Sequence, residues 1–419
     1  MYLWGDFSTD FTMKPLKFFL SAILLAVVFS LSSCVSEGGK SARYVFYFIG
    51  DGMGFSHVAL TEAYLATKEG KIGSDPLRFS SFPVMGMATT YSASNYITCS
   101  SAAGTALSTG RKTNNGMLGM APDSTKLRSI AYDIHDAGYK VGIITTVTID
   151  HATPGAFYAN SPDRNDYYTV AAQLPESGFE FFGGGGFEGL KKMGDRKSPF
   201  EIAAENGYTV LYGESDFEAN KGNAEKIIYF QSKGKENDIL PYAFDRDSSD
   251  LTLAELVKGA VEVLDNEKGF FIMAEGGKID WAAHSNDVTN TIYETLDFDQ
   301  AIEVAYQFYL RHPDETLIVV TADHETGGVT LGRTKGYTFD LSIVPDRRSD
   351  AKGLETNVEN YMEQIPVDSL SKAARIGWTT RSHTGGAVPV FAIGSGSDKF
   401  AGRMDNTQIP ARIKEAMAL

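Results

Sequence analysis

Residues 43–54 read RYVFYFIGDGMG, a continuous apolar run that ends in an aspartate set among glycines. The pattern recurs at residues 269–280, which read GFFIMAEGGKID, and at residues 316–328, which read TLIVVTADHETGG. Unbroken apolar runs of this length are typical of strands that are buried on both faces, as in a parallel sheet covered by helices. We therefore expect an α/β fold with a central, mostly parallel sheet flanked by helices on both faces. Helical patterns intervene at residues 129–137, 253–266 and 292–310.

Residues that can bind metal ions follow each of these runs. A further run, residues 140–148, has the same ending, and residues 387–393 follow a histidine. In open α/β sheets the ligand site lies beyond the carboxyl ends of the strands, so these side chains should lie along one edge. They are Asp51, His151, Thr153, Glu275, Asp280, Asp323 and His324. One aspartate after a strand usually serves as a turn or cap residue, but four such places together indicate a metal site.

The histidines support this interpretation. The chain has only seven, and His151, His284, His324 and His383 all fall in these clusters. Asp280 and His284 are four residues apart, which places both on one face of a helix and suits shared coordination. A set of carboxylates and imidazoles fits Zn²⁺, whereas the oxygen ligands of Asp51, Thr153 and Glu275 fit Mg²⁺. We expect the other three, His57, His135 and His312, to lie at the surface or to fill space.

A nucleophile is expected in residues 97–110, which read ITCSSAAGTALSTG. Serines ahead of an Ala-rich segment are good helix caps. The same position lets backbone N–H groups and the helix dipole stabilise an anion, and a neighbouring metal ion would activate the hydroxyl. The spacing alone does not choose between Ser100 and Ser101.

The composition limits the classes of function. The chain has 419 residues, of which 43% are hydrophobic and 22% charged, which is typical of a globular protein. Its net charge is −15, so we expect no nucleic acid as a specific partner. Two cysteines, Cys34 and Cys99, are too few for a disulfide framework or a cysteine-built zinc finger.

Taken together, these motifs resemble the alkaline phosphatase family over about residues 43–415. The resemblance implies hydrolysis of small-molecule phosphate monoesters through a phosphoserine, at a site with two Zn²⁺ and one Mg²⁺. The family's active-site pattern matches residues 97–105 and selects Ser100 as the nucleophile. Arg164, in the segment SPDRN at residues 161–165, stands where the family keeps an arginine that clamps the phosphate.

The same resemblance assigns the metal ligands. Those of the first zinc are Asp280, His284 and His383; those of the second are Asp51, Asp323 and His324; those of the magnesium are Asp51, Thr153 and Glu275, with His151 beside them. Three residues depart from the best-known bacterial members of the family. His151 replaces an acidic residue behind the magnesium, as in the animal branch. Cys99 replaces an aspartate that steadies the arginine, and Trp281 replaces a lysine near the phosphate, so we expect weaker binding of phosphate.

The N-terminus has the features of an export signal. Residues 13–34 contain two lysines, roughly fourteen mostly apolar residues and then small residues before Cys34. We expect a signal over residues 1–33, with the true start at Met13, and a tether over residues 34–42. Leu-Ser-Ser-Cys34 resembles a bacterial lipobox, which implies a lipidated Cys34, membrane attachment and a periplasmic or cell-surface lipoprotein.

The remaining residues, 43–419, are expected to form one α/β domain with insertions. These lie near residues 183–250 and 334–380, and the resemblance places the second at a crown that is compatible with a homodimer. Two other functions stay open. One is a phosphodiesterase of the same superfamily, and the other is a lipoprotein that binds metal or phosphate without turnover. A sulfatase is disfavoured because residues 99–103, CSSAA, lack the proline and arginine that its modified nucleophile needs.

Overall fold

A ten-stranded sheet forms the centre of the computed structural model, which describes residues 41–232, 239–345 and 367–419. These residues belong to one unit, Ser41–Leu419. The predicted export signal with Cys34 lies outside the described residues, as do residues 346–366 of the second predicted insertion. From one edge to the other the strands are β14 (Gly402–Asp405), β2 (Val84–Thr89), β13 (Val388–Gly394), β8 (Thr316–Thr321), β1 (Tyr44–Gly50), β7 (Phe270–Gly276), β3 (Lys140–Thr145), β4 (Phe181–Gly184), β6 (Lys226–Phe230) and β5 (Tyr208–Tyr212).

The sheet is parallel except at one strand. β1 pairs in parallel with β7 and with β8, and β3, β4, β6 and β5 continue the parallel order toward one edge. β13 is antiparallel to both of its neighbours, β8 and β2, and β14 pairs in parallel with β2. The predicted α/β fold with a mostly parallel sheet is therefore confirmed.

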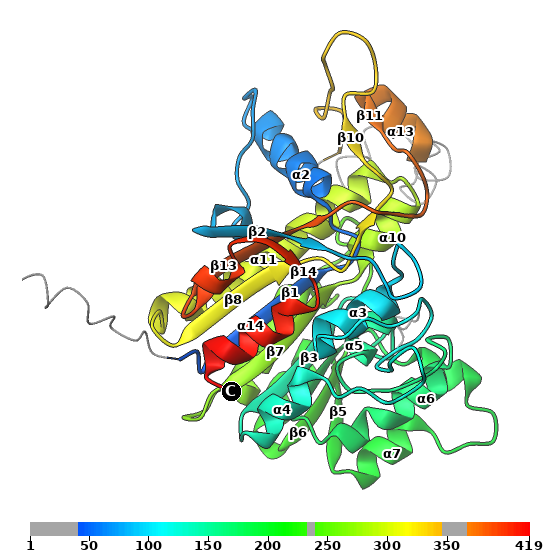
Figure 1. Cartoon of the computed structure of the whole chain (residues 1–419), viewed down its shortest axis with the longest axis vertical. Coiled ribbons are helices and arrows are strands. Elements are labelled where there is room, and N and C mark those ends of the chain that lie inside the picture. The colour runs from blue at the N-terminus through cyan, green and yellow to red at the C-terminus, as the bar shows by residue number, and fades with distance from the viewer. Residues whose placement is uncertain (1–40, 233–238, 346–366) are drawn as a thin grey trace, which may run out of the picture. The chain divides into compact units, whose positions relative to one another are not determined.

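Helices cover both faces of this sheet (Figure 1). The principal ones are α2 (Phe55–Lys68), α3 (Ser100–Thr109), α4 (Ile130–Asp136), α5 (Ala152–Gly155), α6 (Tyr167–Gln173), α7 (Pro199–Glu205), α8 (Gly213–Asn220), α9 (Leu253–Leu264), α10 (Lys278–His284), α11 (Val288–Arg311), α13 (Val367–Ala374) and α14 (Gln408–Met417). Among the described residues, no helix combines the length and the apolar character needed to cross a membrane.

The side chains of β1 show why both faces need a cover. Phe46 and Phe48 pack against Phe308 and Phe298 of α11, with ring centroids 5.6 and 5.8 Å apart. Tyr47 points the other way, and its hydroxyl donates to a carbonyl oxygen of α3. Because successive side chains alternate between the faces, a strand enclosed in this way must be apolar throughout. This is the physical basis of the unbroken run in the sequence.

The region predicted as a surface insertion at residues 183–250 also contributes to the sheet. Its β6 and β5 extend the sheet beyond β4, and every residue of β6 except Lys226 is buried. Each of these strands is only five residues long, and the polar helix α8 lies between them, so the sequence shows no long apolar run here. In the other predicted insertion, β11 (Ile376–Gly377) pairs with β10 (Thr330–Leu331).

The carboxyl ends of four parallel strands, β1, β3, β7 and β8, lie along the same edge of the sheet. In the register of the sheet, Gly50 at the end of β1 lies beside Gly276 of β7, and Thr145 of β3 lies beside Glu275. β8 ends alongside β1 in the same register. The segments after these strands, including α5 and α10, therefore gather at one place, and α3 packs against α5 there (Figure 1).

Candidate active site

Three groups of potential metal ligands lie at this edge, each with ligand atoms within 4.8 Å of one another. The outer group consists of Asp280, His284 and His383; the inner group consists of Asp51, Asp323 and His324; the third group consists of Asp51, His151 and Glu275. These are the carboxylates and histidines that the sequence indicated. Asp51 belongs to two groups, because it ends the strand between β7 and β8.

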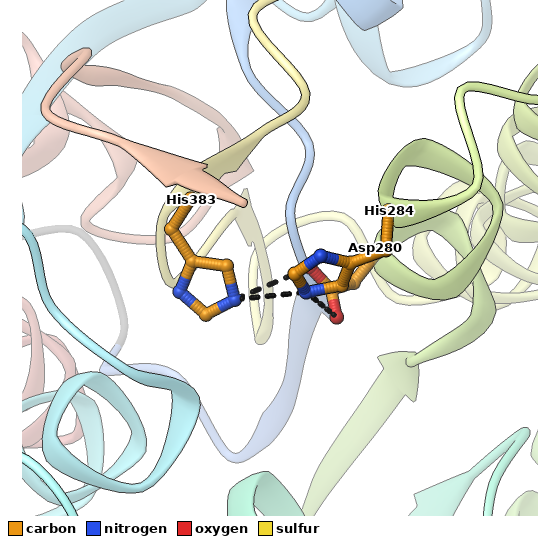
Figure 2. Close-up of side chains that lie close together, drawn as sticks. All are labelled: Asp280, His284 and His383. Atoms are coloured by element: carbon orange, nitrogen blue, oxygen red, sulfur yellow. Dashed lines mark hydrogen bonds and ion pairs between the residues drawn. The ribbon is translucent and has the colours of Figure 1, made fainter. Parts of the chain in front are cut away.

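The outer group is built mainly by helix α10, which begins directly after β7 (Figure 2). The Nε2 atom of His284 lies 3.3 Å from Oδ2 of Asp280 and 3.1 Å from Nε2 of His383. The Nδ1 atoms of His284 and His383 lie 2.7 and 2.8 Å from the backbone carbonyl oxygens of Arg381 and Thr98. Since a carbonyl only accepts, both rings carry a proton on Nδ1, and in the neutral form of each ring, which is the form that binds a metal ion, the Nε2 lone pairs face the same point. Without a metal ion, Nε2 of His284 can instead be protonated and donate to Asp280. Two lone pairs and a carboxylate at one point suit a cation.

The inner group surrounds His324 and has no exposed surface. Its Nε2 atom lies 3.1 Å from Oδ2 of Asp323 and 3.4 Å from Oδ1 of Asp51. The hydroxyl of Ser100 lies 3.3 Å from the same nitrogen. Ser101 instead contacts the sulfur of Cys99, at 3.2 Å. Of the two serines that the spacing left open, Ser100 is the one beside the metal ligands.

The carboxylates of the inner and third groups fit cations on electrostatic grounds. Both oxygens of Asp51, Oδ2 of Asp323 and Oε1 of Glu275 are buried and accept no hydrogen bond from the described residues. Burial, together with neighbouring carboxylates, raises the pKa of Asp51 and of Asp323 well above the usual range. Burial likewise raises the pKa of Glu275 to about 7. Buried negative charge of this density requires a compensating charge, which bound metal ions supply.

The outer group has different electrostatics. Burial opposes the charge of Asp280, but hydrogen bonding from His284 and the nearby imidazoles outweigh it and hold the pKa of this carboxyl below its usual range. The same hydrogen bond raises the pKa of His284, which is only partly buried. Burial lowers the pKa of His383, so that its ring is neutral and able to bind a metal ion.

The third group lies at the end of β3. Glu275 accepts a hydrogen bond from the hydroxyl of Thr145, and Thr153, the predicted oxygen ligand, is fully buried at the start of the following helix. His151 lies beside an arginine and two aromatic rings here, one of which is the stacked ring of Tyr167. Its Nε2 atom lies 3.3 Å from a guanidinium nitrogen of Arg164, and its ring lies 6.0 Å from that of Trp281.

Arg164 is therefore held differently from the arrangement that the resemblance implies. Its guanidinium donates to the ring of His151, while Cys99, at the position of the expected aspartate, accepts a hydrogen bond from the backbone of Gly116 at 3.2 Å. The backbone of Arg164 is bonded to the same glycine, at 2.8 Å. Sequence reasoning identified both substitutions but did not foresee that the histidine contacts the arginine.

The sequence did not single out two residues that lie beside these groups. His57, expected at the surface or as filler, is fully buried, and its Nδ1 accepts from the backbone of Gly54 at 3.1 Å. The hydroxyl of Thr326 donates to Oδ1 of Asp280 at 2.5 Å and lies 3.2 Å from Nδ1 of His324. The sequence signal that could have identified Thr326 is its place in the Glu-Thr pair that directly follows Asp323-His324.

The fold and these groups define a class: a metal-dependent hydrolase with an α/β fold, whose candidate metal centre consists of carboxylates and imidazoles and lies beside a serine hydroxyl at the N-terminus of a helix. The alkaline phosphatase family model matches residues 42–183 and 192–419. The chain belongs to the alkaline phosphatase family and is an enzyme that hydrolyses phosphate monoesters.

Known relatives and solved structures cover nearly the whole chain. Alkaline phosphatase 3 of Bacillus subtilis is 29% identical over 464 aligned positions, which span 96% of this chain and 97% of the relative. The structure of the alkaline phosphatase from the Antarctic bacterium TAB5 covers 90% of this chain and 99% of its own, with a TM-score of 0.74 and 29% identity. A TAB5 variant in which a histidine is replaced by glutamate has Mg bound in its M3 site and aligns with a TM-score of 0.72, at 29% identity and over 90% and 99% of the two chains.

Proposed function

We propose that Ser100 is the nucleophile and that phosphate monoesters are cleaved through a phosphoserine. The position of the Ser100 hydroxyl, 3.3 Å from Nε2 of the buried His324, carries this proposal. Ser100 is also the first residue of α3, where unpaired backbone N–H groups and the helix dipole favour a negative charge. The position beside His324 and the position at the helix N-terminus both concern the hydroxyl oxygen of Ser100, which must lose its proton to attack phosphorus.

The proposed reaction has two steps. The oxygen of Ser100 forms a bond to phosphorus while the bond from phosphorus to the leaving alcohol breaks, and the alcohol departs with a proton. A water molecule then attacks phosphorus from the opposite side, the bond to Ser100 breaks, and inorganic phosphate leaves. Both steps conserve the phosphoryl group, and neither needs a redox partner.

We propose two Zn²⁺ ions and one Mg²⁺ ion as cofactors. His284 and His383 with Asp280 would hold one zinc, and His324 with Asp51 and Asp323 the other; Asp51, Thr153 and Glu275 would hold the magnesium, with His151 beside it. The ions would supply positive charge to the attacking and leaving oxygens of an in-line displacement. The all-oxygen ligands of the third site favour the harder cation.

The role proposed for Arg164 is to bind the non-bridging oxygens of the phosphoryl group in a bidentate fork. Its contact with His151 holds the guanidinium at the third group. Because most contacts between the enzyme and its substrate would be to phosphoryl oxygens, the enzyme would discriminate little between alcohol groups and would accept many monoesters.

A comparison of monoester and diester substrates tests this function. The chain from residue 35 onward would be assayed at alkaline pH with Zn²⁺ and Mg²⁺ on a phosphate monoester and on its matching diester. We expect kcat/KM to favour the monoester strongly and a chelator to abolish it. A preference for the diester would move the chain to the phosphodiesterases and exclude Arg164 as a working clamp. Binding of metal without turnover would indicate the non-catalytic alternative.

We further propose that the protein is exported and attached to a bacterial membrane through a lipidated Cys34, with a homodimer as its assembly. The support is the lipobox-like sequence before Cys34 and the crown-like position expected for residues 334–380. Labelling with a fatty acid would test the anchor. The label should enter the full chain and be absent from the Cys34→Ser variant, whereas labelling of both would contradict the proposal.

A further inference from the structure

The side chain of Glu325 links three segments that carry metal ligands. It directly follows His324 of the inner group, and the residue is only 7% exposed. One carboxylate oxygen accepts from the backbone N–H of Gly328 at 2.9 Å, and the other accepts from the hydroxyl of Thr384. Thr384 directly follows His383 of the outer group. A buried carboxylate that is satisfied by two separate segments fixes their relative position.

The bond between Glu325 and Thr384 crosses a very short ribbon. β9 (Glu325–Thr326) pairs antiparallel with β12 (His383–Thr384), so that Glu325 lies opposite Thr384 and Thr326 lies opposite His383. Side chains alternate between the faces of a strand. One face therefore carries the carboxylate and its hydroxyl partner, and the other face carries Thr326 and His383 (Figure 2 shows His383 on its strand).

The second face belongs to the metal centre. Thr326 contacts both Asp280 of the outer group and His324 of the inner group. The rings of His324 and His383 are stacked, with centroids 3.6 Å apart. The register of this ribbon thus sets the distance between a ligand of one group and a ligand of the other. A slip of one residue would turn His383 to the opposite face.

Glu325 also packs on the segment that follows Asp51. A Cβ atom added to Gly54 would lie 2.3 Å from Cγ of Glu325, so the backbone of this loop rests directly on the glutamate side chain. The backbone N–H of Thr326 donates to the carbonyl of Gly52 at 3.1 Å, which ties the same two segments together. All three ligand-bearing segments, after β1, after β8 and at β12, therefore meet at one carboxylate.

We propose that Glu325 is a positioning residue which, through Thr384, locks the two-residue ribbon and so holds His383 at the distance from His324 that the metal centre requires. This role rests on the metal centre of the proposed function. It does not involve contact with substrate. A ribbon of two residues per strand has few backbone hydrogen bonds, and the side-chain bond supplies much of what keeps its register.

Zinc affinity is the property that tests this role. The metal-free full-length protein would be titrated with Zn²⁺ against a chromophoric chelator, and we expect Glu325→Ala to weaken binding of the outer-group zinc about 10- to 100-fold. Glu325→Gln should restore most of the affinity, because its amide can accept from Gly328 and donate to the oxygen of Thr384. Unchanged affinity in Glu325→Ala, or loss in Glu325→Gln equal to that in Glu325→Ala, would overturn the proposal.

A double-mutant cycle with Thr384→Val separates positioning from general stability. If the glutamate acts through this hydroxyl, Thr384→Val should also lower zinc affinity, Thr384→Ser should restore it, and the double variant should bind no more weakly than Glu325→Ala alone. Fully additive losses would overturn the proposal. The Thr384 variants also keep the test valid if Glu325→Ala fails to fold.

Glu180→Ala is a matched control at the amino-terminal end of β4, away from the carboxyl ends of the strands. Glu180 is less deeply buried than Glu325, but it also has two partners, the backbone of Val141 at 2.9 Å and the ring of His135 at 3.2 Å. We expect this variant to lower the melting temperature and to leave zinc affinity unchanged. An equal loss of zinc affinity in the control would show that Glu325 acts only through stability. If the wild-type chain binds no zinc, the proposed metal centre itself is wrong.

Discussion

The inner and outer groups of the site use the same kinds of ligands but differ in their access to solvent. The side chains of Asp51, Asp323 and His324 have no exposed surface, whereas those of His284 and His383 are 36% and 14% exposed. Ser100 lies against the inner group. In the proposed reaction, the enclosed group would activate the nucleophile, and the open group would be where the alcohol leaves and a water molecule enters.

The same difference decides which group depends more on bound metal. In the inner group, burial and mutual repulsion raise the pKa of two carboxyls, so that its negative charge is unstable without a cation. In the outer group, an ion pair between Asp280 and His284 already compensates the charge. The inner group is therefore the more demanding part of the site, and the predictions below test this contrast.

Replacing Ser100 with alanine should have the largest effect. We expect kcat for a phosphate monoester to fall by about 10³-fold or more, because the substitution removes the hydroxyl that lies beside Nε2 of His324. Zinc content, measured by atomic emission, should stay at the wild-type level, since the substitution removes no carboxylate or imidazole. Ser101→Ala is the matched control and should retain turnover. Equal losses in the two variants would mean that the serines are only structural.

Loss of a ligand should cost more in the inner group than in the outer group. We expect Asp323→Asn to lower kcat/KM roughly 10²- to 10³-fold, since it removes a fully buried charge that the metal centre uses. His284→Asn should cost less, because solvent can replace a half-exposed ligand. Zinc retained after dialysis should follow the same order. A greater loss in His284→Asn would contradict the contrast between the groups.

In the metal-free protein, the contribution of Glu275 to folding stability should fall as pH rises. The pKa of Glu275 is raised from 4.5 to about 7, so the folded metal-free protein holds a proton there that the unfolded chain releases. This contribution to the free energy of unfolding is present below pH 4.5 and is lost as pH rises through about 7, at up to about 1.4 kcal/mol per pH unit. Melting temperatures of the metal-free protein at pH 5 and pH 8 measure it.

Asp51 and Asp323, whose pKa values are raised by burial, should add to this slope in the same direction. Bound Zn²⁺ and Mg²⁺ should reverse it, because they favour the ionised carboxylates. Burial lowers the pKa of His57 to about 4 and that of His151 to about 3, and these histidines oppose the slope. The Glu275→Gln variant carries no titrating group at that position, so the difference between its melting temperatures and those of the wild type at pH 5 and pH 8 isolates the contribution of Glu275. An equal pH dependence of the two metal-free proteins would refute this account.

The smallest effect is expected at Cys99. A carboxylate at this position would lie near Arg164 and would add a charge-assisted hydrogen bond, so Cys99→Asp should tighten inhibition by phosphate about tenfold. Trp281→Lys adds a positive charge near His151 and should act in the same direction. The inhibition constant of inorganic phosphate measures both. Cys99→Ser is the control and should leave this constant close to its wild-type value.

Much of this protein was predictable because its chemistry is coded in local segments. The apolar runs predicted β1, β3, β7, β8 and β13. The residues after four of these runs, together with the histidine before the fifth, predicted every carboxylate and histidine of the three groups. An enclosed parallel strand must be apolar along its whole length, and its carboxyl end must face the ligand site. Both requirements act within a few consecutive residues, so a single sequence is enough to recognise them.

Other features depend on contacts between distant segments. β2 and β14 carry no unbroken apolar run, and β5 and β6 are short strands within a region that the sequence presented as a surface insertion. Their place in the sheet is set by the neighbours that they pair with. The contact of Arg164 with His151 likewise arises where the chain turns back on itself, and no spacing rule gives it.

The sequence by itself identified the candidate metal ligands and the edge of the sheet on which they lie. The resemblance to the family already favoured Ser100 over Ser101, but only the tertiary structure decided that one group is enclosed while the other is open and that Glu325 joins the segments of both. The reason is physical: ligand type and strand burial are properties of neighbouring residues, whereas access to solvent and the register of a two-residue ribbon result from segments that meet only in the folded chain.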